Sequence, residues 1–206
     1  TVMVVSFVNS GLMNLMQATG VILGANIGTT ITGQLIAFNL SDVAPLFVIV
    51  GVVMLMFCKK AKIKRFGEVV LGFGILFMGL STMGGALTSI KDSPQIVDFL
   101  KSLENPLAAM VVGFSITAVL QSSSATVGIV ILMASQGLLE FTICPFLILG
   151  CNIGACVSAL VASLGGNKDA KRAALIHFLF NAIGSAIAFV ILMVALGPVT
   201  GGILQI

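Results

Sequence analysis

Long apolar runs separated by short polar stretches give this chain its pattern. Apolar segments occupy residues 18–38, 43–58, 66–89, 143–164 and 173–196. Most are close to the length of about 20 residues that a helix needs to cross a bilayer. None shows the strict alternation of a membrane β-strand, so we predict membrane-spanning helices.

Two shorter apolar arms, residues 106–120 and 125–139, flank the polar run Q-S-S-S at residues 121–124. Each arm is too short to cross a bilayer comfortably. Together they predict a re-entrant hairpin with a polar tip at membrane depth, which needs protein or a water-filled cavity around it. Two full crossings are the alternative; the hairpin is favoured by the short arms and the polar tip.

The composition indicates that lipid surrounds much of the chain. Of the 206 residues, 58% are hydrophobic and 8% are charged, whereas a soluble domain carries about 25% charged residues. We therefore predict an all-α, polytopic membrane protein. The four cysteines lie in or beside apolar segments without a CxxC pair, and we expect them to be small buried hydrophobic residues.

One motif occurs twice, 126 residues apart: G-A-N-I-G at residues 24–28 returns as G-C-N-I-G at residues 150–154. Both copies interrupt an apolar segment, so we predict two repeats, each with a re-entrant hairpin and a broken transmembrane helix. By the same offset, the counterpart of Q-S-S-S falls before Thr1, so we expect the chain to begin inside its first hairpin.

This pattern predicts three parts. Residues 1–58 are the remainder of repeat 1, with the second hairpin arm, the broken helix and the following span. Residues 59–104 hold a cytoplasmic basic loop, a connecting span and an outside loop. Residues 105–206 are repeat 2, with the hairpin, its Q-S-S-S tip, the broken helix and the last span.

Charge predicts the orientation. Eight of the ten Lys and Arg residues fall in residues 59–65 and 167–172, and positive loops stay in the cytoplasm. Both basic loops then lie inside, the loop 91–104 lies outside, and the two hairpins enter from opposite faces. Inverted repeats with interrupted helices indicate a secondary transporter with its site near the midplane, expected in the cytoplasmic (inner) membrane.

The predicted spans offer hydroxyl and carboxamide groups instead of charges. No Asp or Glu lies inside them, so a proton relay is not expected. Hydroxyls and freed carbonyls suit Na⁺, and N–H groups at the starts of half-helices suit an oxyanion. We infer a sodium-coupled carrier of a small oxyanion. These polar side chains are Gln121, Ser122, Ser123, Ser124, Thr126, Asn26, Asn152, Thr29, Thr30, Thr32 and Ser158.

An enzyme is not expected. Ser123 and His177 lack a third group that would orient the histidine, and no G-x-S-x-G elbow occurs. His177 and Asn181, one turn apart in the last span, are interpreted as a hydrogen-bonded structural pair, with a role at the site as the alternative.

With these motifs assembled, the chain resembles the type II sodium–phosphate cotransporter family, bacterial branch. The resemblance rests on Q-S-S-S followed by G-x-N-I-G, on the first G-x-N-I-G with its Thr-Thr, and on residues 171–181. It implies import of inorganic phosphate with Na⁺ as the coupling ion by alternating access. The implied phosphate residues are Gln121, Ser122, Ser123, Ser124, Asn26 and Asn152. The implied sodium residues are Gln121, Ser122, Ser124, Thr126, Asn26, Thr29, Thr30 and Asn152.

The second motif is followed by Ala155 and Cys156 where the first has Thr29 and Thr30, so the half-sites are not expected to coordinate identically. The expected partners are inorganic phosphate and the lipid bilayer, without nucleic acid, and a homo-oligomer is compatible with this expectation. A carrier of sulfate or a carboxylate, and a non-transporting protein that senses phosphate, are the alternatives.

Overall fold

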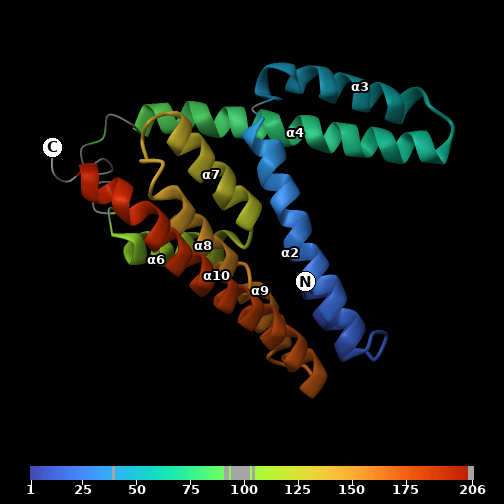
Figure 1. Ribbon diagram of the computed structural model, residues 1–206. Coiled ribbons are helices and arrows are strands. Elements are labelled where there is room, and N and C mark those ends of the chain that lie inside the picture. Colours follow the sequence, from blue (N-terminus) through green and yellow to red (C-terminus); the bar gives the residue numbers. More distant parts are fainter. Residues whose placement is uncertain (39, 91–92, 94–102, 104, 204–206) are drawn as a thin grey trace.

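The computed structural model describes residues 1–38, 40–90, 93, 103 and 105–203, which form helices joined by short connections (Figure 1). No strand occurs among these residues. The elements in chain order are α1 (Val2–Asn9), α2 (Leu15–Ala37), the 3-10 turn η1 (Leu40–Val43), α3 (Ala44–Phe57), α4 (Ala61–Ile90), α6 (Pro106–Leu120), α7 (Ser123–Ser135), α8 (Cys144–Gly154), α9 (Val157–Ser163) and α10 (Lys168–Ile203).

Five helical stretches are long and apolar enough to cross a bilayer, and they confirm the predicted all-α, polytopic membrane protein. They are Leu15–Ala37, Leu40–Phe57, Ala61–Leu87, Cys144–Ser163 and Lys168–Leu196. Many large apolar side chains on these helices are exposed, such as Met16 at 82% and Val194 at 72%, as lipid-facing positions would be.

The arms of the predicted hairpin are short helices. α6 has 15 residues and α7 has 13. At 1.5 Å per residue the longer arm spans about 22 Å, less than the roughly 30 Å hydrocarbon core. These lengths suit the re-entrant hairpin. The predicted outside loop 91–104 lies outside the described residues except at positions 93 and 103.

The basic stretches differ from the predicted loops. α4 begins at Ala61 and α10 begins at Lys168, so six of these eight cations lie within the first five residues of a helix. The polar side chains there remain exposed, and Arg172 pairs with Asp169 at 3.0 Å across one turn. A helix can therefore continue from the membrane into the basic region without a separate loop.

Glycine allows α6 and α8 to cross closely. A Cβ on Gly150 would lie 2.0 Å from the Met110 carbonyl oxygen, and one on Gly113 would lie 2.1 Å from the Leu147 carbonyl oxygen. A Cβ on Gly154 would lie 2.6 Å from the carbonyl oxygen of Phe114. Small residues let membrane helices approach in this way, and this crossing fixes the second G-x-N-I-G motif against the hairpin.

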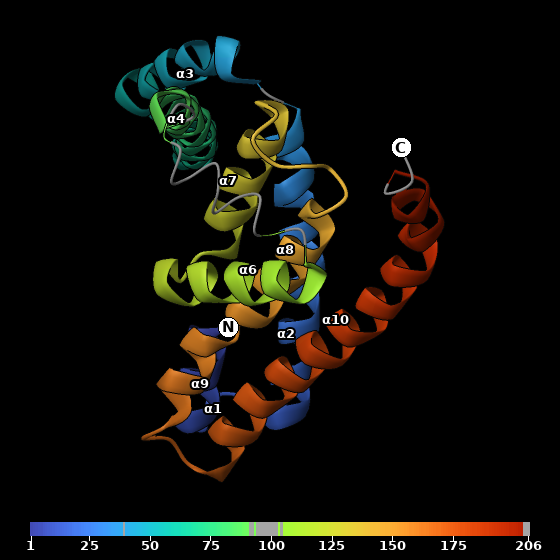
Figure 2. The same ribbon diagram turned by 90° about the vertical axis from the view of Figure 1, so that its left-hand side faces the viewer.

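α3 and α4 form a separate antiparallel pair beside the remaining helices (Figures 1 and 2). Gly51, Gly67 and Gly74 lie where the two helices touch, because a Cβ on any of them would come within 3 Å of an atom of the partner helix. The ring centroids of Phe47 and Phe73 are 5.4 Å apart in an edge arrangement. This pair lies away from the crossing of α6 and α8.

The backbone repeats with the same 126-residue offset as the sequence. Gly11 and Gly137, which follow α1 and α7, have φ angles of +74° and +70°, a region that glycine enters without steric cost. In each copy the following leucine N–H donates to the carbonyl five residues earlier at 2.9 Å, which is a Schellman turn. α2 ends at Ala37 and α9 at Ser163, again in register.

The two copies differ at their G-x-N-I-G motifs. α2 runs unbroken through residues 24–28, so the broken helix predicted for repeat 1 is not observed. Each glycine costs a helix only about 1 kcal/mol relative to alanine, which is too little to interrupt a helix of 23 residues. In repeat 2, α8 ends at Gly154 and α9 starts at Val157. The Cys156 N–H bonds the Ile153 carbonyl three residues back, which tightens the turn between them.

Candidate functional site

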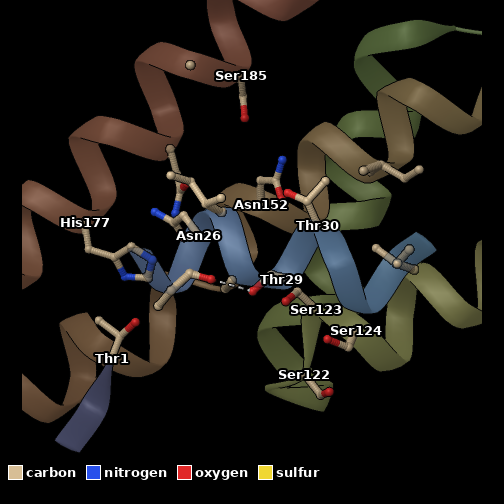
Figure 3. A pocket seen from close by; sticks show the side chains of 18 of the residues that line it. Thr1, Asn26, Thr29, Thr30, Ser122, Ser123, Ser124, Asn152, His177 and Ser185 are labelled. Carbon is tan, nitrogen blue, oxygen red and sulfur yellow. Dashed lines mark hydrogen bonds between the residues drawn. The ribbon is translucent and has the colours of Figure 1, made fainter. Parts of the chain in front are cut away.

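A cavity of about 940 Å³ lies between α2, the α6–α7 tip, the α8–α9 break and α10 (Figure 3). Both copies of the repeated motif reach it, through Asn26 on α2 and Asn152 on α8. The polar residues that line it are Thr1, Asn26, Thr29, Thr30, Gln34, Gln121, Ser122, Ser123, Ser124, Asn152, Ser158, His177, Asn181 and Ser185.

The Q-S-S-S run forms the tip between α6 and α7. Gln121 ends α6 with a φ angle of +55°, and Ser122 caps α7 by accepting the Ala125 N–H at 3.3 Å. Ser123 and Ser124 form the first turn of α7, where backbone N–H groups have no carbonyl one turn back. The positive end of the α7 dipole therefore lies at the cavity together with three hydroxyls.

α2 presents a polar face one turn long. The Thr29 hydroxyl donates to the Ala25 carbonyl at 3.0 Å, which leaves its lone pairs available to a cation. The Asn26 Nδ2 is buried and has no hydrogen-bond partner. Figure 3 shows Thr29 on the side of α2 toward Ser123 and Thr30 on the side toward Asn152. A donor without a partner and hydroxyl oxygens thus come from the same turn.

α8 and α9 contribute the matching segment of repeat 2. Asn152 is exposed and lines the cavity, two residues before α8 ends. Ala155 lines the cavity where repeat 1 has Thr29, and Cys156 is fully buried where repeat 1 has Thr30. The second half of the site therefore supplies fewer hydroxyl oxygens than the first.

α10 adds a polar stripe to the cavity; Ser185 was not predicted from the sequence, and a structural pair was the favoured interpretation of His177 and Asn181. His177, Asn181 and Ser185 recur every four residues and line the cavity. The Asn181 Nδ2 donates to the Cys156 Sγ at 3.1 Å, and the Ser185 hydroxyl donates to the Leu149 carbonyl at 3.3 Å. The predicted hydrogen bond between His177 and Asn181 is wrong: the His177 Nδ1 has no partner, and the Asn181 Nδ2 donates to Cys156. The sequence signal that could have predicted this stripe was the spacing of its polar residues at i, i+4 and i+8 in an otherwise apolar helix.

The structure brings together eight of the residues predicted for phosphate and sodium. Gln121, Ser122, Ser123, Ser124, Asn26, Asn152, Thr29 and Thr30 all line the cavity. Thr126 does not line it; its side chain is 1% exposed and its hydroxyl donates to the Ser122 carbonyl at 3.1 Å. Its role at sodium stays a prediction, as do the roles of the other seven sodium residues.

Comparison with known proteins identifies the family. The family model described as Na+/Pi-cotransporter matches residues 1–85 and 92–203. The chain belongs to this family.

Among the relatives of this chain is the "Uncharacterized protein YqeW" of Bacillus subtilis (strain 168). It is 30% identical over 199 residues, which cover 95% of this chain and 64% of that protein. The "Putative inorganic phosphate export protein YjbB" of Escherichia coli (strain K12) is 29% identical over 91% of this chain and 35% of its own length. The "Sodium-dependent phosphate transport protein 2A" of Ovis aries is 41% identical over 85 residues, which cover 38% of this chain and 13% of its own length.

The chain thus spans about two thirds of the first of these relatives and about a third of the second. No solved structure matches it.

The polar side chains that line the cavity carry no fixed charge. None of the described residues that line the cavity is Asp, Glu, Lys or Arg. A transported ion would therefore meet hydroxyls, carboxamides, an imidazole and the end of a helix. Such a site can bind ions of either sign without a counter-charge that would hold them too tightly to leave.

Proposed function

We propose that this chain forms the membrane core of a sodium-coupled secondary transporter of inorganic phosphate that works by alternating access. The observation that carries the proposal is the cavity, where the serine tip of the hairpin lies beside the repeated motif of both α2 and α8. Membership of the Na+/Pi-cotransporter family supports phosphate and sodium as the transported pair.

The oxyanion would bind at the start of α7. Ser123 and Ser124 offer hydroxyls and first-turn backbone N–H groups, and the helix dipole favours negative charge at this end. The amides of Asn26 and Asn152 would supply further donors from the two motifs. Several uncharged donors around a tetrahedral anion would replace its hydration shell without a permanent ion pair.

Sodium would bind to oxygen atoms, mainly on the α2 side. Na⁺ is a hard cation that suits hydroxyl, carboxamide and backbone oxygens. Thr29 and Thr30 supply such oxygens, whereas their counterparts Ala155 and Cys156 do not. The proposed sodium ligands include Gln121, Ser122, Ser124, Thr126, Asn26, Thr29, Thr30 and Asn152.

Inverted repeats in the inner membrane would provide the two access states. The basic residues at 59–65 and 167–172 favour a cytoplasmic position for the starts of α4 and α10. Under that orientation the two hairpins enter from opposite faces, and rocking of one repeat against the other would open the cavity alternately.

We propose inward transport, because an inward sodium gradient would drive phosphate along with it. The printed name of the YjbB relative gives export as the direction of that protein, so export is the second candidate. Uptake into proteoliposomes of known orientation, with an imposed sodium gradient in either direction, separates the two.

The test is uptake of radiolabelled phosphate by the full-length protein in proteoliposomes, with and without a sodium gradient. We expect sodium-dependent uptake, reduced roughly tenfold or more in Ser123→Ala, because a hydrogen bond to a charged group contributes about 1.5–3 kcal/mol. Ser115→Ala is the matched control, since the Ser115 hydroxyl donates to the Val111 carbonyl within α6 and does not line the cavity.

Uptake that ignores Na⁺ would contradict the coupling. Stronger inhibition by sulfate or a carboxylate than by unlabelled phosphate would identify a carrier of another anion. Phosphate binding without net uptake would identify a sensor.

A further inference from the structure

His177 stands out among the side chains of the cavity. It is 3% exposed, and its Nδ1 is buried without a hydrogen-bond partner. Figure 3 shows its ring projecting from α10 toward Asn26 and Thr1, into the cavity. Buried polar atoms are nearly always paired, so an unpaired ring nitrogen at a polar cavity marks a position for a ligand atom.

The rest of the α10 stripe is already bonded to protein. Asn181 donates to Cys156 and Ser185 donates to Leu149, which fixes α10 against α8 and against the turn between α8 and α9. The backbone carbonyl of His177 faces the Cys156 Sγ at 3.6 Å. The turn that carries the imidazole is therefore held in place while the ring itself stays available to a ligand.

A neutral imidazole has one nitrogen that donates and one that accepts. None of the described lining residues is acidic, so no carboxylate is present there to stabilise an imidazolium. Asn26, on the facing helix, has a buried Nδ2 that also lacks a partner, and this group can only donate. The two residues together offer an oxyanion both a donor and an acceptor.

An acceptor distinguishes oxyanions that resemble each other in size and shape. Inorganic phosphate keeps at least one P–O–H group at neutral pH, whereas sulfate has none. A ring nitrogen can accept a hydrogen bond from that hydroxyl, but toward sulfate it would face only oxygen lone pairs. A site built to bond a substrate hydroxyl strongly rejects the analogue that lacks it.

We propose that His177 contacts the transported anion and accepts a hydrogen bond from its P–O–H group, so that the cavity prefers phosphate to sulfate. This inference rests on the proposed phosphate transport. It gives His177 a part in specificity, separate from the serine tip, which offers donors to any oxyanion.

The test measures inhibition of radiolabelled phosphate uptake by sulfate in proteoliposomes of the full-length protein. Wild type should need a large excess of sulfate for half-inhibition. In His177→Phe, which fills the volume without a nitrogen, the ratio of the sulfate inhibition constant to the phosphate KM should fall at least about tenfold. His177→Asn, whose carboxamide oxygen can accept a hydrogen bond, should recover part of the preference.

Two further variants complete the design. His177→Leu provides a smaller apolar replacement if phenylalanine prevents folding, which monodisperse elution in detergent reports. Leu179→Ala is the control on the same helix, because Leu179 is 44% exposed and does not line the cavity. It should leave the ratio unchanged.

The possible failures are distinguishable. A wild type that moves no phosphate overturns the proposed function and this inference with it. A wild type that moves phosphate, with an unchanged sulfate ratio in both His177→Phe and His177→Leu, overturns only the role of His177. A fall in the ratio that His177→Asn does not recover would also contradict hydrogen-bond acceptance, because packing alone would then explain the loss.

Discussion

The two copies of the repeated motif lie in unlike surroundings. In an apolar 18-residue stretch of α2, 11% of the residues are buried, whereas in the corresponding stretch of the span formed by α8 and α9 50% are buried. α2 is one unbroken helix, and its counterpart bends after Gly154. The two copies of the motif therefore reach one cavity, through Asn26 and Asn152, from two differently supported helices.

The glycines show how the same motif serves two purposes. Gly150 and Gly154 meet α6 backbone at distances that exclude a Cβ, while Gly24 and Gly28 have nothing within 4 Å of an added Cβ. In repeat 2 the motif glycines are required by packing, and in repeat 1 the described structure does not require them. The asparagine between the glycines reaches the cavity in both copies.

The largest expected effect comes from the glycines. Gly150→Ala should destabilise the protein by about 1–3 kcal/mol or more, because a Cβ would lie 2.0 Å from the Met110 carbonyl oxygen. Gly24→Ala should be neutral or stabilising by up to about 1 kcal/mol, because alanine favours the helix. Thermal unfolding of the two variants in detergent or lipid measures the difference.

Gly154→Ala and Gly28→Ala form a second matched pair at the same offset. Equal losses of stability in the alanine variants of repeat 1 and of repeat 2 would contradict the conclusion that packing requires the motif glycines only in repeat 2. That result would mean that α2 packs as tightly as α8 in the assembled protein.

A smaller effect is expected from the paired asparagines. Asn26→Ala and Asn152→Ala should each weaken phosphate uptake, the first by roughly tenfold, because it removes a buried donor available to a charged ligand. Asn152 is exposed, so its loss should cost less. KM for phosphate and the half-saturating sodium concentration, measured for both variants, give the ranking. Equal loss in both variants would show that the two half-sites contribute alike.

The sequence predicted the membrane class, the helices and most of the cavity, because these depend on local pattern. Apolar runs fix helix positions, and the polar run at residues 121–124 could not lie in lipid without a cavity. Eight predicted site residues line that cavity. The motif that occurs twice predicted a place at the site for Asn26 and Asn152.

What the sequence did not predict depends on tertiary contacts. Whether a glycine breaks a helix or packs a neighbour is decided by the partner helix, so α2 and α8 could not be told apart from their motifs. Asn181 was paired with His177 because they are one turn apart. Its real partner, Cys156, lies 25 residues away in the chain and is brought close only by the fold.

The central claim is that both repeats line one phosphate site. Ala25 lines the cavity from repeat 1 and Ala155 lines it from repeat 2. Cysteines introduced by Ala25→Cys and Ala155→Cys can therefore report on each side of the cavity separately. Both variants are made with Cys58→Ser, because the other three native cysteines are buried. Phosphate with Na⁺ should slow modification of both cysteines by a polar thiol reagent, with the same half-maximal phosphate concentration. Protection of one cysteine alone, or of the two at clearly different concentrations, would contradict a shared site.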